Sequence, residues 1–304
     1  MIEITDGSVT ARVALQGGMV TTSFLVDGQV VQPLYEAPWL GEWSGDTLLA
    51  HLQGDFVCVP FGMPGHGYAA NNLWALVERR PDAVVLEVAY PGEHAVERVT
   101  RTVRCVDGAV EFVDAIDMRH EAALPLGLHP IFRLPATAEG EPLVGAAFLE
   151  LPEAEAVLTP PEKPEPASRL LPGKRFTDVW EAPSVDGTAN LTRLPWEGRS
   201  EDLVMLANVA EGRVGVVTDG HVAVLEWDTA HLKHCLLWIS NRGRDYEPWN
   251  GRNLCLGVEA VTSAFDWGVE ASAGRNEVAD EGFETAVRLG EGRHELWHRI
   301  RLER

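Results

Sequence analysis

Three Asp-Gly dipeptides, each set between two segments rich in β-branched and apolar residues, constrain this chain more than any other feature. They are Asp27-Gly28, Asp107-Gly108 and Asp219-Gly220. Asp-Gly tolerates the positive φ values of a type I′ turn, so each dipeptide predicts a tight β-hairpin. The chain is therefore expected to be built largely from antiparallel strands joined by short turns.

The remaining apolar pattern also has a period of two, and convincing helical stretches are few and short. It predicts strands over residues 84–90, 236–240 and 254–261, and a further hairpin at Gly290-Glu291-Gly292. Many strands with tight turns favour an all-β sandwich or barrel over alternating strands and helices. Local sequence alone does not separate the sandwich from the barrel.

Residues 152–187 interrupt this pattern. Prolines crowd positions 160–166, and a proline has no backbone N–H to donate, so this run cannot be a central strand. We expect an exposed excursion from one domain that spans residues 1–304, which is a size that β-sandwiches reach. A linker between two domains is the alternative.

Charge and composition exclude several functional classes. The formal net charge is -21, so the chain repels nucleic-acid phosphates and anionic lipid headgroups, and neither is an expected partner. No apolar stretch is long enough to span a membrane, and the first residues lack the basic and apolar regions of a signal peptide. We expect a cytoplasmic monomer or homodimer.

The cysteine and histidine spacings indicate neither a metal site nor a redox centre. The four cysteines share no Cys-x-x-Cys spacing and lie in apolar runs, so buried reduced thiols are expected. They are Cys58, Cys105, Cys235 and Cys255. His231 and His234 form an i, i+3 pair without an evident third ligand, and no phosphate-binding glycine loop is present, so neither metal nor cofactor is expected.

Three short segments, far apart in the chain, each place one acid–base side chain among glycines or apolar residues. His66 lies between Gly65 and Gly67, His129 in Gly-Leu-His-Pro-Ile-Phe, and Glu259 in Leu-Gly-Val-Glu-Ala. A charge is expensive to hold in such surroundings, and burial moves the pKa of a carboxyl group towards working pH. Two imidazoles and one carboxylate can move protons between oxygens without a metal. The alternatives are a satisfied core histidine at 129, a loop residue at 66 and an arginine-paired carboxylate at 259.

In this order the segments resemble those of the galactose mutarotase-like superfamily, the aldose 1-epimerases and their relatives. The resemblance implies a large, mostly antiparallel β-sandwich whose broad concave sheet holds a small monosaccharide. It also implies an enzyme that interconverts α and β anomers of a free aldose by opening and reclosing the hemiacetal ring. Glu259 would take the proton of the C1 hydroxyl, His129 would protonate the ring oxygen, and His66 would hold the sugar near that oxygen.

This sequence departs from the family pattern in three places. Ile131 replaces an aromatic residue, and residues 264–266 (Ala-Phe-Asp) replace the usual Pro-Asp turn. No basic residue lies between Pro60 and His66, where many family members carry an arginine that binds a sugar hydroxyl. The identity of the sugar therefore stays open.

Further binding residues are expected from the same resemblance. Residues 200–206 are similar to a segment whose aspartate grips sugar hydroxyls, and Asp202 fits that place better than Glu201, an exposed acid at a strand start being the alternative. Among the ten tryptophans, Trp74, Trp238 and Trp249 lie close in sequence to the site segments. We take Trp74 and Trp249 as candidate platforms for a sugar, with core packing as the alternative.

The loop at residues 241–252 carries Arg242, Arg244 and Arg252. Such arginines can bind an anionic group such as a sugar phosphate through bidentate hydrogen bonds, and Arg244 is the candidate substrate ligand. The alternative is a solvated turn that pairs with the acidic surface. A hexose-6-phosphate 1-epimerase is therefore the second functional hypothesis, and a non-catalytic carbohydrate-binding or regulatory sandwich is the third.

Overall fold

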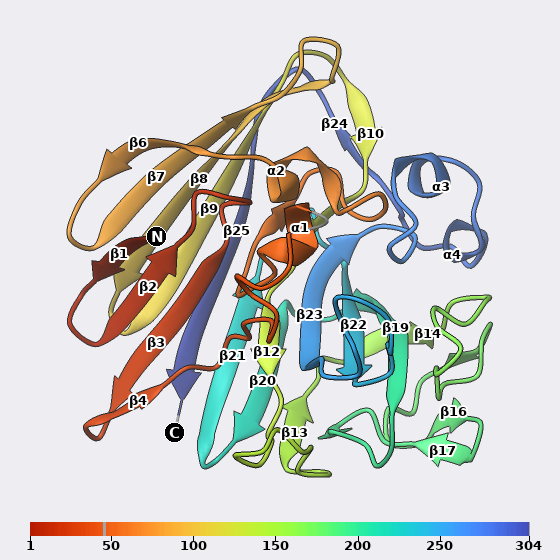
Figure 1. Cartoon of the computed structure of the whole chain (residues 1–304). Coiled ribbons are helices and arrows are strands. Elements are labelled where there is room, and N and C mark those ends of the chain that lie inside the picture. Colours follow the sequence, from red (N-terminus) through yellow and green to blue (C-terminus); the bar gives the residue numbers. More distant parts are fainter. Residues whose placement is uncertain (45–46, 304) are drawn as a thin grey trace.

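Two large antiparallel β-sheets make up most of the molecule (Figure 1). The computed structural model describes residues 1–44 and 47–303. The nine-stranded sheet has the order β18 (Arg193–Leu194), β13 (Ala147–Glu150), β20 (Arg213–Thr218), β21 (His221–Trp227), β25 (Gly292–Glu303), β9 (Ala109–Met118), β8 (Val96–Val106), β7 (Ala83–Ala89), β6 (Ala75–Arg79). The eight-stranded sheet has the order β15 (Arg175–Phe176), β14 (Ala154–Leu158), β19 (Ser200–Val209), β22 (His234–Asn241), β23 (Leu254–Thr262), β11 (Leu126–Leu128), β5 (Val57–Cys58), and β12 (Ile131–Arg133) also pairs with β23.

Smaller elements complete the fold, and the expected all-β architecture is confirmed. The small sheets are β1 (Ile2–Thr5), β2 (Val9–Val13), β3 (Val20–Val26) and β4 (Gln29–Val31), then β10 (Ala122–Leu124) with β24 (Val287–Leu289), and β16 (Ala182–Ser184) with β17 (Gly187–Ala189). The helices are α1 (Thr47–Ala50), α2 (Gly67–Asn71), α3 (Val269–Ala273) and α4 (Glu277–Asp280). Within the described ranges, no helix combines the length and the apolar character that a membrane crossing needs.

The three Asp-Gly hairpins are confirmed. They join β3 to β4, β8 to β9, and β20 to β21. The φ values of the aspartates are 50°, 50° and 48°, and those of the glycines are 78°, 73° and 81°. Two successive positive φ values are what a type I′ turn requires, so local turn chemistry decided these connections.

The hairpin predicted at residues 290–292 is wrong. The turn joins β24 to β25, but these strands belong to different sheets: β24 pairs with β10, and β25 pairs with β9 and β21. Glycine-rich turn residues specify a change of chain direction and do not specify a partner strand.

The strands β19, β22 and β23 are buried on both faces. On one face, Leu237 belongs to the core cluster that includes Phe112 and Ile300 of the nine-stranded sheet. On the other face, Trp238 belongs to a second cluster with Trp249 and with residues of the loops around α1 and α3. Because this second face is covered by loops and short helices rather than by a sheet, it is where an opening to solvent can form.

A cluster of four charged or titratable side chains, which we call the core ion network, links the nine-stranded sheet to the segment that leads into β5. It consists of Asp55, Arg101, Asp114 and His298, none of which has exposed side-chain area. Arg101 Nη2 lies 2.5 Å from Asp55 Oδ2, and Arg101 Nε lies 3.1 Å from Asp114 Oδ1. Burial by itself raises the pKa of Asp55, but Arg101 and His298 outweigh burial and hold this pKa at about 2. The buried carboxylate is therefore an anion.

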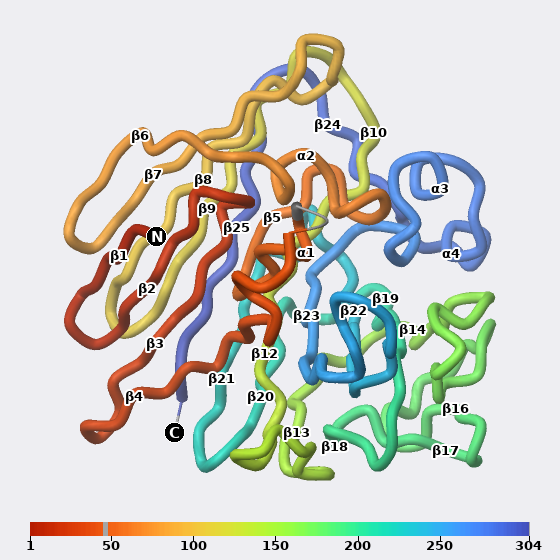
Figure 2. The backbone as a smooth tube through the Cα atoms, in the orientation of Figure 1, coloured from red at the N-terminus to blue at the C-terminus, as the bar shows by residue number. Residues whose placement is uncertain are grey.

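Residues 152–187, which were expected to form an exposed excursion, include a strand of the eight-stranded sheet. Residues 154–158 form β14, which pairs with β19 inside the eight-stranded sheet. The chain then forms a proline-rich loop over residues 159–174 and returns at β15 to pair with β14. Figure 2 shows this part of the chain in green at the right of the view. The loop therefore starts and ends at the edge of the sheet that carries the site.

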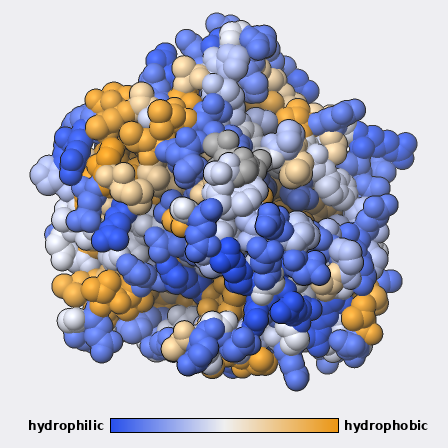
Figure 3. Space-filling view, viewed as in Figure 1, coloured by the Kyte–Doolittle hydropathy of each residue, from blue (hydrophilic) through white to orange (hydrophobic). Residues whose placement is uncertain are grey.

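The surface in Figure 3 is mostly hydrophilic, with apolar side chains gathered at the upper left, over β6. Leu76 and Val77 of β6 are 46% and 59% exposed, and Leu73, just before this strand, is 69% exposed. β6 is an edge strand, and its register with β7 shifts between Leu76 and Glu78. A bulge and nearby charges are common devices against edge-to-edge pairing.

Candidate functional site

A cavity of about 380 Å³ opens on the face of the eight-stranded sheet that the loops cover. His66, His129 and Glu259, which lie far apart in the sequence, all line it, as do Arg244 and Trp249. Small-molecule sites commonly have volumes of about 300–1,000 Å³, so this space suits one small ligand. Five of the seven residues predicted from sequence are therefore brought together.

Strand register places His129 opposite Glu259. Gly127 on β11 pairs with Val261, and Ile131 on β12 pairs with Gly257, both on β23. His129 lies midway between these two pairs, so its partner position on β23 is Glu259. His129 Nε2 is 3.4 Å from Glu259 Oε1. The two groups are neighbours on one wall rather than facing each other across the cleft.

Two local features fix the orientation of this pair. The His129 ring stacks on Phe56, with ring centroids 4.5 Å apart and an interplanar angle of 18°. The backbone N–H of His129 donates to the Phe56 carbonyl at 2.8 Å. A Cβ at Gly257 would lie 2.5 Å from Glu259 Oε1 and 3.1 Å from Trp238 Cβ, so only glycine leaves room for the carboxyl group.

Burial sets the protonation state of the pair. Glu259 is 2% exposed, and burial, with a smaller contribution from Asp266, raises its pKa well above the usual range. His129 is 4% exposed, and burial, followed by the nearby His66, lowers its pKa well below the usual range. Burial therefore favours the state in which the pair holds one proton, on Glu259, beside a neutral imidazole.

His66 reaches the cavity from a turn that glycines permit. Its φ is 57°, and the flanking Gly65 and Gly67 have φ values of 59° and 82°. A Cβ at Gly67 would come within 2.3 Å of the Pro60 carbonyl oxygen, so this close approach needs glycine. The rings of His66 and His129 meet edge to face, with centroids 4.8 Å apart. Burial, and then Arg244, lowers the pKa of His66 to about 4, so this imidazole is neutral as well.

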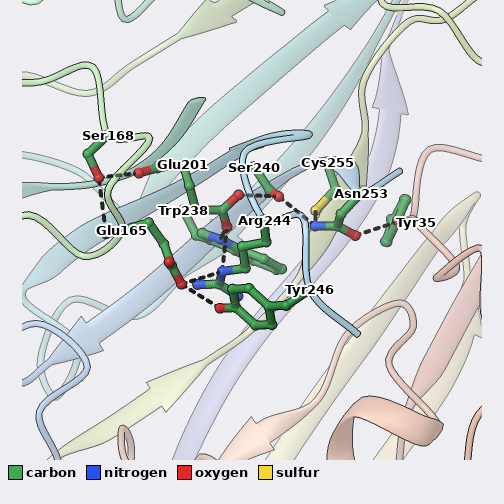
Figure 4. Close-up of polar contacts among 10 residues, drawn as sticks. All are labelled: Tyr35, Glu165, Ser168, Glu201, Trp238, Ser240, Arg244, Tyr246, Asn253 and Cys255. Carbon is green, nitrogen blue, oxygen red and sulfur yellow. Dashed lines mark hydrogen bonds and ion pairs between the residues drawn. The ribbon is translucent and has the colours of Figure 1, made fainter. Parts of the chain in front are cut away.

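Arg244 is held beside the cavity by two carboxylates (Figure 4). Its Nε lies 3.1 Å from Glu165 Oε1 and 3.3 Å from Glu201 Oε1. Its guanidinium carbon lies 4.6 Å from the ring centroid of Trp249 and 5.7 Å from that of Trp238. Ion pairing and stacking together fix the position of this cation.

Glu201 supports the wall of the cavity from behind. Its side chain is 1% exposed and accepts hydrogen bonds from Trp238 Nε1 at 2.6 Å and Ser240 Oγ at 2.8 Å. Burial raises its pKa, although Arg244 and these two donors oppose the change. Glu201 therefore positions Trp238 and Arg244.

Asp202 does not line the cavity, which corrects the preference for it over Glu201. Successive side chains of a strand point to opposite faces, so Glu201 lies on the cavity side of β19 and Asp202 on the other. Asp202 is 1% exposed, and its Oδ1 accepts the backbone N–H of Leu170 at 2.8 Å. Burial raises its pKa.

Trp74 does not line the cavity either, which corrects its assignment as a sugar platform. It is 1% exposed and lies in the core cluster shared by the two large sheets. Its indole N–H donates to the Ala69 carbonyl at 2.9 Å, within α2. Trp74 therefore holds the short helix that follows His66.

Several cavity residues had no assigned role in the sequence analysis. Trp238 was noted only for its proximity in sequence, and Glu165, Tyr246 and Asp266 were not candidates. Tyr246 Oη donates to Glu165 Oε1 at 2.6 Å. Burial raises the pKa of Asp266, with Arg244 acting in the opposite direction. The cavity is thus richer in carboxyl groups than the three sequence segments indicated.

The other two arginines of the 241–252 loop lie outside the cavity lining and are paired with surface acids. Arg242 Nη1 is 2.7 Å from Glu141 Oε2, and Arg252 Nη1 is 3.2 Å from Glu42 Oε2. Residues 1–44 and 47–303 contain no group of three or more His, Cys, Asp or Glu side chains placed to hold a metal ion. The four cysteines are buried and free, as expected.

Comparison with known proteins shows the fold. An Escherichia coli K12 protein to which aldose 1-epimerase activity is provisionally ascribed superposes with a TM-score of 0.70 at 15% identity, over 99% of this chain and 98% of that one. A galactose mutarotase-related enzyme from Lactobacillus acidophilus gives 0.66 at 13% identity, covering 100% and 97%. A galactose mutarotase-like protein from Lactobacillus casei gives 0.65 at 16% identity, covering 100% of both chains. The sequence matches no protein-family model and no curated protein.

These similarities confirm the resemblance expected from the three sequence segments, at the level of the fold. The chain has the galactose mutarotase-like β-sandwich fold over its whole length. At 13–16% identity, the shared fold does not transfer an activity, so the reaction must be argued from the site itself.

Proposed function

We propose that this protein is an aldose 1-epimerase-like isomerase, which interconverts the α and β anomers of a free aldose without a cofactor. The observation that carries the proposal is the contact between His129 Nε2 and Glu259 Oε1, 3.4 Å apart in a cavity of about 380 Å³. The C1 hydroxyl oxygen and the ring oxygen of an aldose are bonded to the same carbon. Two adjacent proton-transfer groups can therefore reach both oxygens of one sugar.

The proton balance of the reaction fits a pair that holds one proton. The proton of the pair first passes from Glu259 to His129 across their 3.4 Å contact. In ring opening, the Glu259 carboxylate then takes the C1 hydroxyl proton, the bond between C1 and the ring oxygen breaks, and the His129 imidazolium protonates the released oxygen. This leaves a protonated Glu259 and a neutral His129, which is the state that burial favours in the resting site. After rotation about the C1–C2 bond, the same transfers run backwards and close the ring on the other face.

The other cavity residues serve to bind and orient the sugar in this proposal. His66 lies edge to face with His129 and is neutral, so its ring nitrogens can exchange hydrogen bonds with the ring oxygen or a neighbouring hydroxyl. Trp238 and Trp249 offer apolar surface to the C–H face of the ring. Arg244 supplies a guanidinium group to sugar hydroxyls. It comes from the 241–252 loop, whereas many family members carry a sugar-binding arginine between the positions of Pro60 and His66.

Exchange spectroscopy by NMR tests the proposal with a panel of free aldoses. The wild-type protein should exchange the anomers of at least one sugar faster than buffer does, and Glu259→Gln should remove the excess. The matched control is Glu270→Gln, which removes one exposed carboxylate nearby in the sequence. Saturable sugar binding without exchange in the wild type would select the non-catalytic alternative. An undiminished rate in Glu259→Gln would refute the assigned roles.

A further inference from the structure

The proline-rich loop brings one carboxylate to the cavity. Glu165 Oε1 lies 3.1 Å from Arg244 Nε and accepts the Tyr246 hydroxyl at 2.6 Å. Its side chain is 16% exposed, and that of Arg244 is 21% exposed. Figure 4 shows the carboxylates of Glu165 and Glu201 both in contact with the Arg244 guanidinium. Arg244, the single arginine among the described residues that line the cavity, is therefore already paired with carboxylates.

The loop holds Glu165 in place through Ser168. Ser168 Oγ lies 2.5 Å from the backbone oxygen of Glu201 on β19 and 3.2 Å from the backbone nitrogen of Glu165. The backbone N–H of Ser168 donates to the Glu165 carbonyl at 3.0 Å. Prolines at 164 and 166 fix φ on either side of Glu165, so the backbone that carries this carboxylate has little freedom to move away from Arg244.

The charges that face Arg244 disfavour an anionic ligand. Glu165 and Glu201 contact the guanidinium, and Asp266 and His66, whose pKa values Arg244 lowers, line the same cavity. A phosphate or carboxylate substituent would have to displace Glu165 from Arg244 and then lie beside the displaced charge. Like charges brought together in a partly desolvated site repel each other strongly. A hydroxyl needs no such displacement, because a guanidinium has five N–H donors.

We propose that Glu165 is a specificity-determining residue, which restricts the cavity to uncharged sugars by occupying Arg244. The inference rests on the proposed function, which supplies the sugar substrate. In this inference, the proline-rich loop excludes sugar phosphates and sugar acids. Removal of the Glu165 charge frees Arg244 as a site for anions. Hexose-6-phosphate 1-epimerase activity is therefore disfavoured in the natural chain. We expect it as a gained activity in the Glu165→Gln variant.

The first experiment measures inorganic phosphate binding by calorimetry in the wild type, Glu165→Gln and Glu162→Gln. Glu162 is an exposed glutamate of the same loop, so its change removes the same charge away from Arg244. Glu165→Gln should bind phosphate at least about tenfold more tightly than the wild type, and Glu162→Gln should bind like the wild type. Equal phosphate affinity in all three proteins would overturn the inference, as would an equal gain in both variants. Glu165→Ala serves as a second variant with the same expected gain.

The second experiment measures anomer exchange of an aldose and of its 6-phosphate. The ratio of kcat/KM for the phosphorylated sugar to that for the free sugar should rise at least about tenfold in Glu165→Gln, and an unchanged ratio would contradict the inference. If the wild type exchanges no sugar, the proposed function fails, while phosphate binding still decides the role of Glu165. The two failures are therefore distinguishable.

Discussion

The cavity pair and the core ion network place similar groups in similar surroundings. In the cavity, His129 stacks on Phe56 and its Nε2 lies 3.4 Å from Glu259. In the core ion network, His298 stacks on Phe112, with centroids 4.2 Å apart, and its Nε2 lies 3.1 Å from the carboxylate of Asp55. Each is a buried histidine on a phenylalanine beside a buried carboxyl group.

The two carboxyl groups nevertheless have opposite pKa shifts. Arg101 pairs with Asp55 and outweighs burial, so the pKa of Asp55 is about 2. No cation offsets the effect of burial on Glu259, so burial raises the pKa of this group. The difference teaches that a buried carboxyl group is a fixed anion where its charged partners outweigh burial, as Arg101 and His298 do at Asp55. A similar group without an arginine is a proton carrier suited to acid–base work.

The largest expected effect is on catalysis by the cavity pair. Glu259→Gln and His129→Asn should each lower kcat for anomer exchange by about 10²–10⁴-fold, because each removes one member of the acid–base pair. The double variant should be about as slow as either single variant, since the two groups share one proton and act as a unit. Exchange spectroscopy by NMR measures all four proteins. Additive losses would show that the residues act independently.

The next effect is on stability, through the core ion network. Arg101→Met should lower the free energy of unfolding by about 3–5 kcal/mol, because it leaves Asp55 and Asp114 buried without their cation. Urea unfolding followed by tryptophan fluorescence measures the change. The matched control is Arg293→Met, whose side chain is 52% exposed beside Asp117 and Glu295, and which should cost at most about 1 kcal/mol. Equal losses in both variants would remove the basis of the comparison.

The smallest effect is a shift of the pH profile. At low pH, His129 is protonated while Glu259 is still protonated, so the pair holds two protons and activity should fall. At high pH, the pair loses its only proton and activity should fall again. Asp266 contributes to the raised pKa of Glu259, so Asp266→Asn should move the high-pH limb of kcat/KM to lower pH. Glu270→Gln, which removes an exposed charge nearby in the sequence, should leave this limb in place. A shift to higher pH in Asp266→Asn would contradict the assignment.

Local chemistry made some of the fold and site predictable from sequence. The three Asp-Gly turns needed only their own φ preferences, so the hairpins were predicted correctly. The hairpin predicted at residues 290–292 was wrong, because β24 pairs with β10, which is distant in the sequence. Three segments with conspicuous surroundings led to His66, His129 and Glu259, which the fold brings into one cavity.

Other site residues left no usable signal in the sequence. Every residue of β19 except Asn208 is buried, so hydrophobic alternation could not show whether Glu201 or Asp202 faces the cavity. Glu165 lies in a loop whose composition indicates only that it is not a strand. Its contact with Arg244 spans 79 residues and depends on how the loop folds back onto β19. Such contacts follow from tertiary structure alone.

The protonation state of Glu259 tests the central claim most directly. The measurement is an infrared difference spectrum at neutral pH between the wild type and Glu259→Gln, supported by the same spectrum for Asp55→Asn. The wild type minus Glu259→Gln spectrum should contain the carbonyl band of a protonated carboxylic acid, and the Asp55→Asn spectrum should contain only carboxylate bands. A carboxylate signal from Glu259 in the resting protein would contradict the claim that an uncompensated buried carboxyl group carries the proton.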